Sequence, residues 1–266
     1  MTIIAWDTAT SILSVALVCG AFSKHRAQWY VEIDAGQRHG ELLMEVSDQV
    51  IKTARLKPGD VDLVVCMQGP GSFTGLRIGF AAAKGMALAL KIPLLTVPTL
   101  DCMALSCSLW PGMVIPVIDA KKQCYFTALY QKEQRITEYM DVTPAQIAEL
   151  MVQNRKNDLR IREEGILLTG PDGEQVLTAL KALRSIAPDI RDQIHLDPWA
   201  KRGWGKELVE LAQRKLQAGD GELMKELRDT SDVFSGPLYL RKSDAELGRA
   251  AYEAPTGELA SPESLS

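Results

Sequence analysis

Histidine is scarce in this chain, and its scarcity limits the chemistry that the chain can perform. Only three occur among 266 residues: His25, His39 and His195. No two of them are close enough in sequence to share a helical turn or a hairpin as a metal-ligand pair. A G-x-S-x-G nucleophile elbow is also missing, and Ser72 has no evident histidine partner. We therefore expect no catalytic residues and no metal site in this chain.

Cysteines, long apolar runs and positive charge are limited as well. The five cysteines are odd in number and mostly embedded in apolar runs, which favours reduced, buried thiols over disulfides or a zinc site. The N-terminus lacks a basic start, and no apolar run reaches eighteen residues, so we expect neither a signal peptide nor a membrane span. The net charge of −4 argues against a broad basic surface for nucleic acid. These features indicate a cytoplasmic protein.

A glycine-rich segment followed by an apolar helix is the most informative feature that is present. The segment Gly69–Gly75 reads GPGSFTG and follows a predicted strand over residues 61–67. The next residues predict a helix over about 75–90, with Thr74 as its N-cap. This helix is apolar or small on nearly every side, so one face can cover a sheet while the other needs a second cover.

The glycine loop does not match the common phosphate-binding loops. A P-loop needs a lysine and a hydroxyl residue directly after its last glycine, but Leu76 and Arg77 stand there. Asp7, after the first predicted strand, is the best candidate for a catalytic carboxylate, although Ala9 stands where phosphate-binding hairpins use glycine. Two interpretations stay open: tight structural turns, or a vestigial anion site made of Asp7, Thr8, Gly69, Gly71 and Arg77.

The order of strands and helices predicts an α/β protein with two related units. Residues 1–108 form the first α/β lobe, and residues 109–198 form a second, smaller lobe. A helix over about 199–216 is expected to return to the first lobe and pack with it. A helix is expected from about His39 to Arg55. His39 itself is expected to be a cap or surface residue. A surface loop is expected over residues 154–164. Residues 217–266 form a C-terminal extension whose last part is expected to be disordered.

Several blocks of the sequence resemble the TsaB (YeaZ) family. They include IIAWDTATSILSVAL, RHGELL, GPGSFTGLRIGFAAAKGMALALKIPLLTVPTLD, PVIDAKKQCYFTALY and PLYLRKSDAE. The resemblance implies an actin/Hsp70/hexokinase-like (ASKHA) fold of two related α/β lobes with mixed sheets. It also implies a role in the synthesis of N6-threonylcarbamoyladenosine at position 37 of tRNAs that read ANN codons.

Within that pathway, the resemblance implies a non-catalytic scaffold that activates a TsaD-like threonylcarbamoyltransferase. TsaD-like chains carry two metal-binding histidines four residues apart on one helix, and Thr99 and Met103 stand at those positions here. No cofactor is therefore expected in this chain, whereas ATP and a divalent metal are expected on partner subunits. The other implied partners are a TsaE-like ATPase, a second copy of the chain when TsaD is absent, and tRNA through the complex only.

The family also suggests where the partner binds. The helices predicted over residues 39–55 and 75–90 would pair with the same helices of TsaD, or of a second copy, as a four-helix bundle. The expected interface residues are Leu42, Val46, Phe80, Ala82, Gly85, Met86 and Ala89. Two other functions stay open: a metal-dependent, glycoprotease-like hydrolase, and a small-molecule kinase on the same fold.

Overall fold

The first lobe is built on a five-stranded sheet whose central strands are buried on both faces. In the computed structural model, which describes residues 1–157, 159–219 and 236–240, the strand order is β3-β2-β1-β4-β5. Strands β1, β2 and β3 are antiparallel, and β1, β4 and β5 are parallel. The strands are β1 (Thr2–Asp7), β2 (Ile12–Cys19), β3 (Ala27–Asp34), β4 (Leu63–Gly69) and β5 (Leu94–Pro98).

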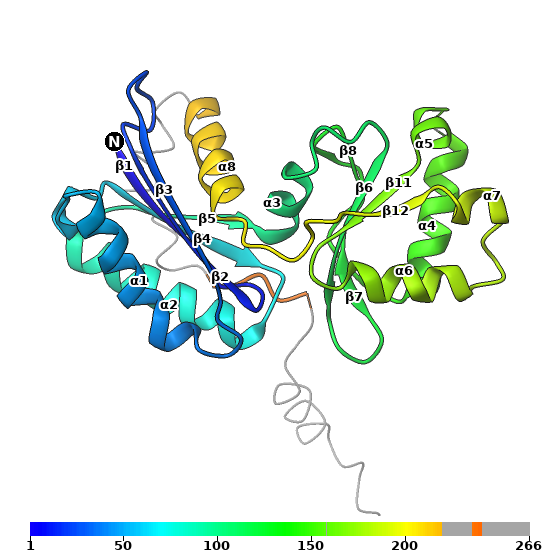
Figure 1. Cartoon of the computed structure of the whole chain (residues 1–266), viewed down its shortest axis with the longest axis horizontal. Helices are drawn as coiled ribbons and strands as arrows, with labels where there is room; N and C mark the ends of the chain where they lie inside the picture. Colours follow the sequence, from blue (N-terminus) through cyan, green and yellow to red (C-terminus); the bar gives the residue numbers. More distant parts are fainter. Residues whose placement is uncertain (158, 220–235, 241–266) are drawn as a thin grey trace, which may run out of the picture.

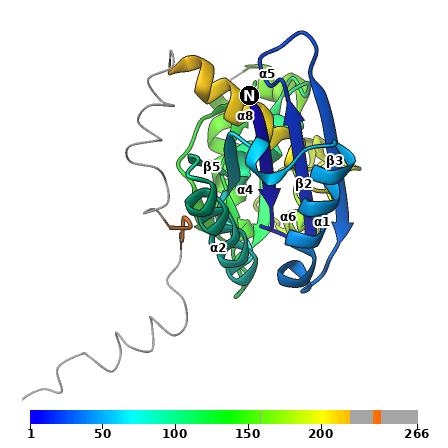
Figure 2. The ribbon, with the colours of Figure 1, turned by 90° about the vertical axis from the view of Figure 1, so that its left-hand side faces the viewer.

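Helices cover both faces of this sheet (Figure 1). On one face α1 (His39–Thr53) and α2 (Phe73–Leu90) lie side by side (Figure 2). The short helix η1 (Pro58–Asp60) connects α1 to β4, and α2 follows β4. On the opposite face lies α8 (Gly205–Ala218). Helix α1 is amphipathic because Leu43, Val46 and Val50 recur at helical spacing and pack on the sheet.

The second lobe contains a seven-stranded sheet, five strands of which follow the order β10-β7-β6-β11-β12. Helix α3 (Thr99–Leu105) connects the two lobes. The strands are β6 (Met113–Asp119), β7 (Tyr125–Thr127), β8 (Tyr130–Gln131), β9 (Gln134–Arg135), β10 (Met140–Val142), β11 (Ile166–Thr169) and β12 (Ile194–Leu196). The helices are α4 (Pro144–Asn157), α5 (Leu159–Glu164), α6 (Gly173–Ala182) and α7 (Pro188–Arg191).

The α/β fold with two mixed sheets agrees with the prediction, but several element predictions were wrong. In the expected surface loop over residues 154–164, the described residues 154–157 and 159–164 are helical, and Ile161 anchors α5 in the second-lobe core. The last helix begins at Gly205 instead of Trp199, because residues 199–204 are the connection that returns to the first lobe. His39 is buried rather than exposed, and Arg38 precedes the helix as its N-cap.

The structure does not test two of the predictions. The domain boundaries at residues 108 and 198 stay predictions. The expected disorder falls on residues 243–266, which lie outside the described part of the chain.

Candidate functional site

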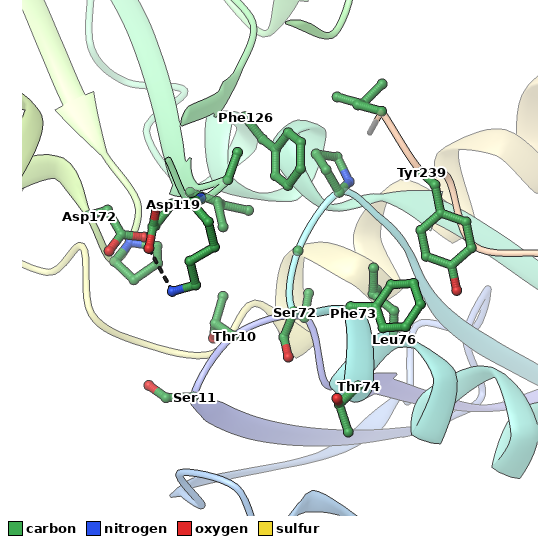
Figure 3. A pocket seen from close by; sticks show the side chains of 18 of the residues that line it. Thr10, Ser11, Ser72, Phe73, Thr74, Leu76, Asp119, Phe126, Asp172 and Tyr239 are labelled. Carbon is green, nitrogen blue, oxygen red and sulfur yellow. Dashed lines mark hydrogen bonds and ion pairs between the residues drawn. The ribbon is translucent and has the colours of Figure 1, made fainter. Parts of the chain in front are cut away.

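A cavity of about 830 Å³ lies between the two lobes (Figure 3). The first lobe supplies the β1–β2 turn and the start of α2, including Thr10, Ser72 and Phe73. The second lobe supplies Asp119 and Phe126 on the opposite wall, and a third wall comes from residues 238–240 near the C-terminus. The cavity therefore combines aromatic rings, hydroxyl groups and charged side chains from three distant parts of the sequence.

The second-lobe wall is held by a local network of charges. Lys121 Nζ lies 2.7 Å from Asp119 Oδ2, and the Asp119 backbone N–H donates to Asp172 Oδ2 at 2.8 Å. Burial raises the pKa of Asp172 above its usual value. Lys121 and Lys122 also adopt left-handed backbone conformations, with φ of 64° and 56°. Such conformations are costly for residues with side chains, so the turn after β6 is a strained feature of the cavity wall.

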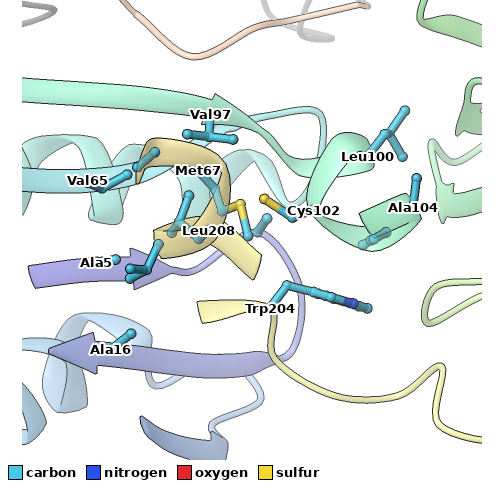
Figure 4. Close-up of a cluster of buried hydrophobic side chains, with 14 of the residues drawn as sticks. Ala5, Ala16, Val65, Met67, Val97, Leu100, Cys102, Ala104, Trp204 and Leu208 are labelled. Atoms are coloured by element: carbon cyan, nitrogen blue, oxygen red, sulfur yellow. The ribbon is translucent and has the colours of Figure 1, made fainter. Parts of the chain in front are cut away.

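Asp7 is not among the residues that line this cavity. It lies in the core next to Trp204, whose side chain Figure 4 shows. The Asp7 side chain is fully buried, its Oδ1 accepts from the Ala9 N–H, and its Oδ2 accepts from the Trp204 N–H, both at 3.0 Å. Trp204 is the N-cap residue of α8. Asp7 therefore ties the β1–β2 turn to the start of a helix nearly two hundred residues later, where the helix dipole favours an anion.

The burial of Asp7 predicts a specific dependence of stability on pH. Burial raises the pKa of Asp7 to about 6, from an ordinary value of 3.8, against the lowering effect of its two backbone donors. The folded state therefore holds this proton more tightly than the unfolded state between about pH 4 and pH 6. Within that window, the contribution of Asp7 to the free energy of unfolding falls as the pH rises.

Replacing Asp7 with asparagine is expected to remove this dependence. The free energy of unfolding of Asp7→Asn, relative to that of the parent, should rise by about 3 kcal/mol between pH 3 and pH 8. The lost hydrogen bond adds a constant offset that does not change with pH. Urea unfolding of both proteins across this range measures the difference, and parallel pH curves would contradict the account.

Glycines pack α2 directly against the β1–β2 turn. A Cβ added to Gly75 would overlap the backbone oxygen of Thr8, and one added to Gly79 would overlap Thr8 Oγ1. A Cβ added to Gly71 would lie 2.5 Å from the Ala9 oxygen. Ser72 N also donates to that oxygen at 2.7 Å. This contact supports the interpretation of the glycine loop as a tight structural turn.

The start of α2 differs from the prediction. Ser72 is the N-cap, and its hydroxyl accepts from the Gly75 N–H at 3.2 Å, whereas Thr74 already lies in the first turn. Arg77 lies on the exposed side of α2, where its Nε donates to the Tyr239 hydroxyl at 3.2 Å. Arg77 therefore lies apart from Asp7 and Thr8 of the predicted anion site, because both of these are buried and Arg77 faces outward.

The outer face of α2 is apolar and open to solvent. Leu88 is 64% exposed, and Ala81, Gly85 and Ala89 are exposed beside it. A Cβ added to Gly85 would meet no atom within 4 Å. Exposed large side chains next to small residues are typical of a surface that contacts another protein.

The structure divides the predicted interface residues into two groups. Val46 and Phe80 expose only 5% and 4% of their surface, because both face the sheet of their own lobe. Their assignment to a partner interface was therefore wrong. The remaining five are accessible at least in part: Leu42, Ala82 and Met86 are half-buried, and Gly85 and Ala89 are exposed.

Two exposed apolar side chains on α1 and α2 were not among the predicted interface residues. Met44 on α1 is 50% exposed, and Leu88 on α2 is 64% exposed. A signal for Met44 was available, because it lies out of phase with the buried positions Leu43, Val46 and Val50. By length and composition α2 could also cross a membrane, which is weak evidence because core helices of soluble proteins meet the same test.

The positions expected to replace a metal-binding histidine pair are inside the protein. Thr99 and Met103 are fully buried on α3, where they belong to the packing between the lobes. In the described part of the chain, no group of three or more His, Cys, Asp or Glu side chains is placed to hold a metal ion.

Comparisons with known proteins agree on one family. The family model for TsaD, tRNA N6-adenosine threonylcarbamoyltransferase, matches residues 33–248. The tRNA threonylcarbamoyladenosine biosynthesis protein TsaB of Bacillus subtilis is 29% identical over 247 residues, which cover 92% of this chain and 96% of that protein. TsaB of Escherichia coli is 28% identical over 205 residues, covering 70% and 86%.

The solved structure of YeaZ from Pseudomonas aeruginosa has the same fold, with a TM-score of 0.65 at 20% identity over 90% of this chain and all of that one. The described residues thus form a two-lobed α/β protein in which the outer, apolar face of α2 is exposed to solvent. The chain belongs to the TsaD family, within which it falls in the TsaB (YeaZ) group.

Proposed function

We propose that this chain takes part in the biosynthesis of tRNA threonylcarbamoyladenosine as a non-catalytic subunit that binds and activates a TsaD-type threonylcarbamoyltransferase. The names of the TsaB relatives support the pathway. The single observation that supports the mode of action is the open apolar face of α2 around Gly85 and Leu88. One apolar side of α2 is therefore exposed in the isolated chain, as expected for a helix that binds a partner protein.

The proposed contact is between helix pairs. Small residues at Ala81, Gly85 and Ala89 allow a second helix to approach α2 closely, and Leu88 supplies a large side chain to bury. Met44 on the neighbouring helix α1 is 50% exposed and supplies further apolar surface on that helix. In the absence of the transferase, the same face would pair with a second copy of the chain, whose surface is identical.

The rest of the assembly follows from the proposed role. A TsaE-type ATPase joins the complex, ATP and the divalent metal belong to partner subunits, and tRNA is bound through the complex. The position of Asp7 supports a non-catalytic role for this chain. Its carboxylate is buried and hydrogen-bonded to backbone N–H groups, so it cannot contact a substrate in the cavity.

A reconstitution tests the proposal. The complete mixture holds this chain, a TsaD-type transferase, a TsaE-type ATPase, the enzyme that forms the threonylcarbamoyl adenylate, and tRNA. We expect modified adenosine from the complete mixture, and none from this chain with tRNA and the adenylate alone. Full activity in a mixture that lacks this chain would contradict the proposal.

The two other functions are less favoured, and each has a direct test. A metal-dependent hydrolase would retain a stoichiometric metal ion after purification, which elemental analysis measures. A small-molecule kinase would bind ATP, and a calorimetric titration of the chain would detect it. The relatives are named for the tRNA pathway, which favours neither alternative.

A further inference from the structure

A short segment near the C-terminus crosses the surface of the first lobe and is built into it. The described residues 236–240 lie extended, and the Leu238 N–H donates to the Gln68 oxygen at the end of β4 at 2.7 Å. Gly69 has a φ of 106°, and a Cβ added there would lie 2.9 Å from the Leu238 oxygen. The segment therefore approaches so closely that position 69 has no room for a side chain.

Tyr239 fastens this segment, called the strap below, to the first turns of α2. Its ring centroid lies 5.2 Å from that of Phe73, and its hydroxyl accepts from Arg77 Nε. The Arg77 guanidinium lies 3.8 Å from the centroid of Phe73. The three side chains form one stacked and hydrogen-bonded cluster, yet Tyr239 and Phe73 remain 40% and 37% exposed. A cluster at the surface of this kind is held by only a few contacts and can open locally.

The other side of the strap faces the cavity between the lobes. Leu238, Tyr239 and Leu240 line it together with the start of α2, and Phe126 and Asp119 lie on the wall that the second lobe supplies (Figure 3). The strap thus forms a wall that belongs to the sheet of neither lobe. Its anchor is on α2, while the space that it borders lies between the lobes.

We propose that the strap is a removable wall of the inter-lobe cavity, held in place by Tyr239 and released when Tyr239 leaves Phe73 and Arg77. The cavity is already partly open to solvent, so docking of the strap narrows the access to it and release widens that access. The geometry points to this device because one residue joins the cavity wall to an exposed helix. Both anchoring contacts of its side chain are on that helix.

The anchor lies on the same face of α2 as the proposed partner surface. Phe73, Arg77, Ala81 and Gly85 follow one another at intervals of four residues, so they share one side of the helix. A partner that competes for Phe73 and Arg77 would release the strap, which couples partner binding to the cavity. This coupling rests on the proposed function, whereas the removable wall itself is a property of the isolated chain.

Thiol labelling of the isolated full chain tests the wall separately from any partner. Ala120 lines the cavity and is 6% exposed, so Ala120→Cys places a reporter there with little change in volume. Trypsin cleavage after Lys121 and Lys122 separates this reporter from the native Cys124, and fragment ions distinguish it from Cys102 and Cys107 on the same peptide. The labelling rate of Cys124 by a bulky maleimide then serves as an internal reference in each digest, measured by mass spectrometry.

Adding Tyr239→Ala to the reporter chain is expected to raise the labelling rate at position 120 by about tenfold or more, because a local opening becomes easier. Tyr239→Phe keeps the ring contact but loses the hydrogen bond from Arg77, so it should raise the rate by less than Tyr239→Ala does. Leu109→Ala removes a side chain that is 97% exposed elsewhere and should change nothing. Arg77→Ala, at an exposed position, provides a second way to loosen the strap and should raise the rate in the same direction. Unchanged labelling rates in both Tyr239→Ala and Arg77→Ala would overturn the proposal.

Discussion

Gly85→Arg is expected to lower the affinity of this chain for a TsaD-type transferase by at least about 100-fold while leaving its own fold intact. A charge buried without a counterpart in a helix–helix contact costs several kcal/mol, and each 1.4 kcal/mol is a factor of ten in affinity. Within the free chain the new side chain meets no atom, because the Cβ position is open. The substitution also replaces glycine in a helix interior, which favours the folded state by about 1 kcal/mol.

Calorimetric titration of the transferase measures the affinity, and thermal unfolding of the variant alone measures its stability. Gln175→Arg is the matched control, because it adds the same charge at an exposed position of α6 in the second lobe. We expect the control to bind like the parent. Equal affinities for Gly85→Arg and Gln175→Arg would place the partner on another surface.

Gly75→Ala is expected to destabilise the chain by about 3 kcal/mol or more, and to lower its unfolding midpoint by roughly 10 °C. The added methyl group would overlap the backbone oxygen of Thr8, and a backbone atom between two strands of a buried sheet cannot move aside cheaply. Alanine is otherwise favoured over glycine in a helix, so a loss of stability can come only from this clash. Denaturant unfolding measures the change, and a neutral or stabilising effect would contradict the close packing of α2 on the turn.

Gly79→Ala provides the comparison, because its new methyl group would meet a side-chain atom, Thr8 Oγ1, instead of the backbone. Alone it should cost about 2 kcal/mol. Combined with Thr8→Ala, which removes that oxygen, it should recover at least about 1 kcal/mol of the loss. The same second substitution should leave Gly75→Ala unrescued, since the oxygen that Gly75 faces belongs to the backbone.

The sequence predicted the elements whose pattern is local. Helix α1 was found within two residues of its end, since Leu43, Val46 and Val50 repeat at helical spacing. Helix α2 was found for a similar reason, but its uniform small and apolar composition does not indicate which side faces the sheet. Phe80 was therefore assigned to the partner, although it packs in the core of its own lobe. Val46 on α1 was assigned with it, although its spacing with Leu43 and Val50 indicates the buried face of that helix. Only the tertiary packing decides between two apolar faces.

The surroundings of the cavity were less predictable because they join distant segments. Asp7 was chosen as a candidate carboxylate from its place after a strand, and its actual partner is the N–H group of Trp204. Nothing in the pattern of either segment connects them. Similarly, the late PLYL segment was noted for its resemblance to the TsaB family, and its contact with Phe73 and Arg77 spans more than 160 residues. Such contacts follow from the way the chain returns to the first lobe, which local periodicity does not encode.

The central claim is that the outer face of α2 binds the transferase, and site-specific photo-crosslinking tests it most directly. A photoreactive residue at Leu88, which is 64% exposed, would lie inside the proposed contact, and one at Gln175 would lie on the other lobe. With a TsaD-type transferase present, the account predicts a covalent product of the two chains from position 88 and none from position 175. A product from position 175 with none from position 88 would contradict it.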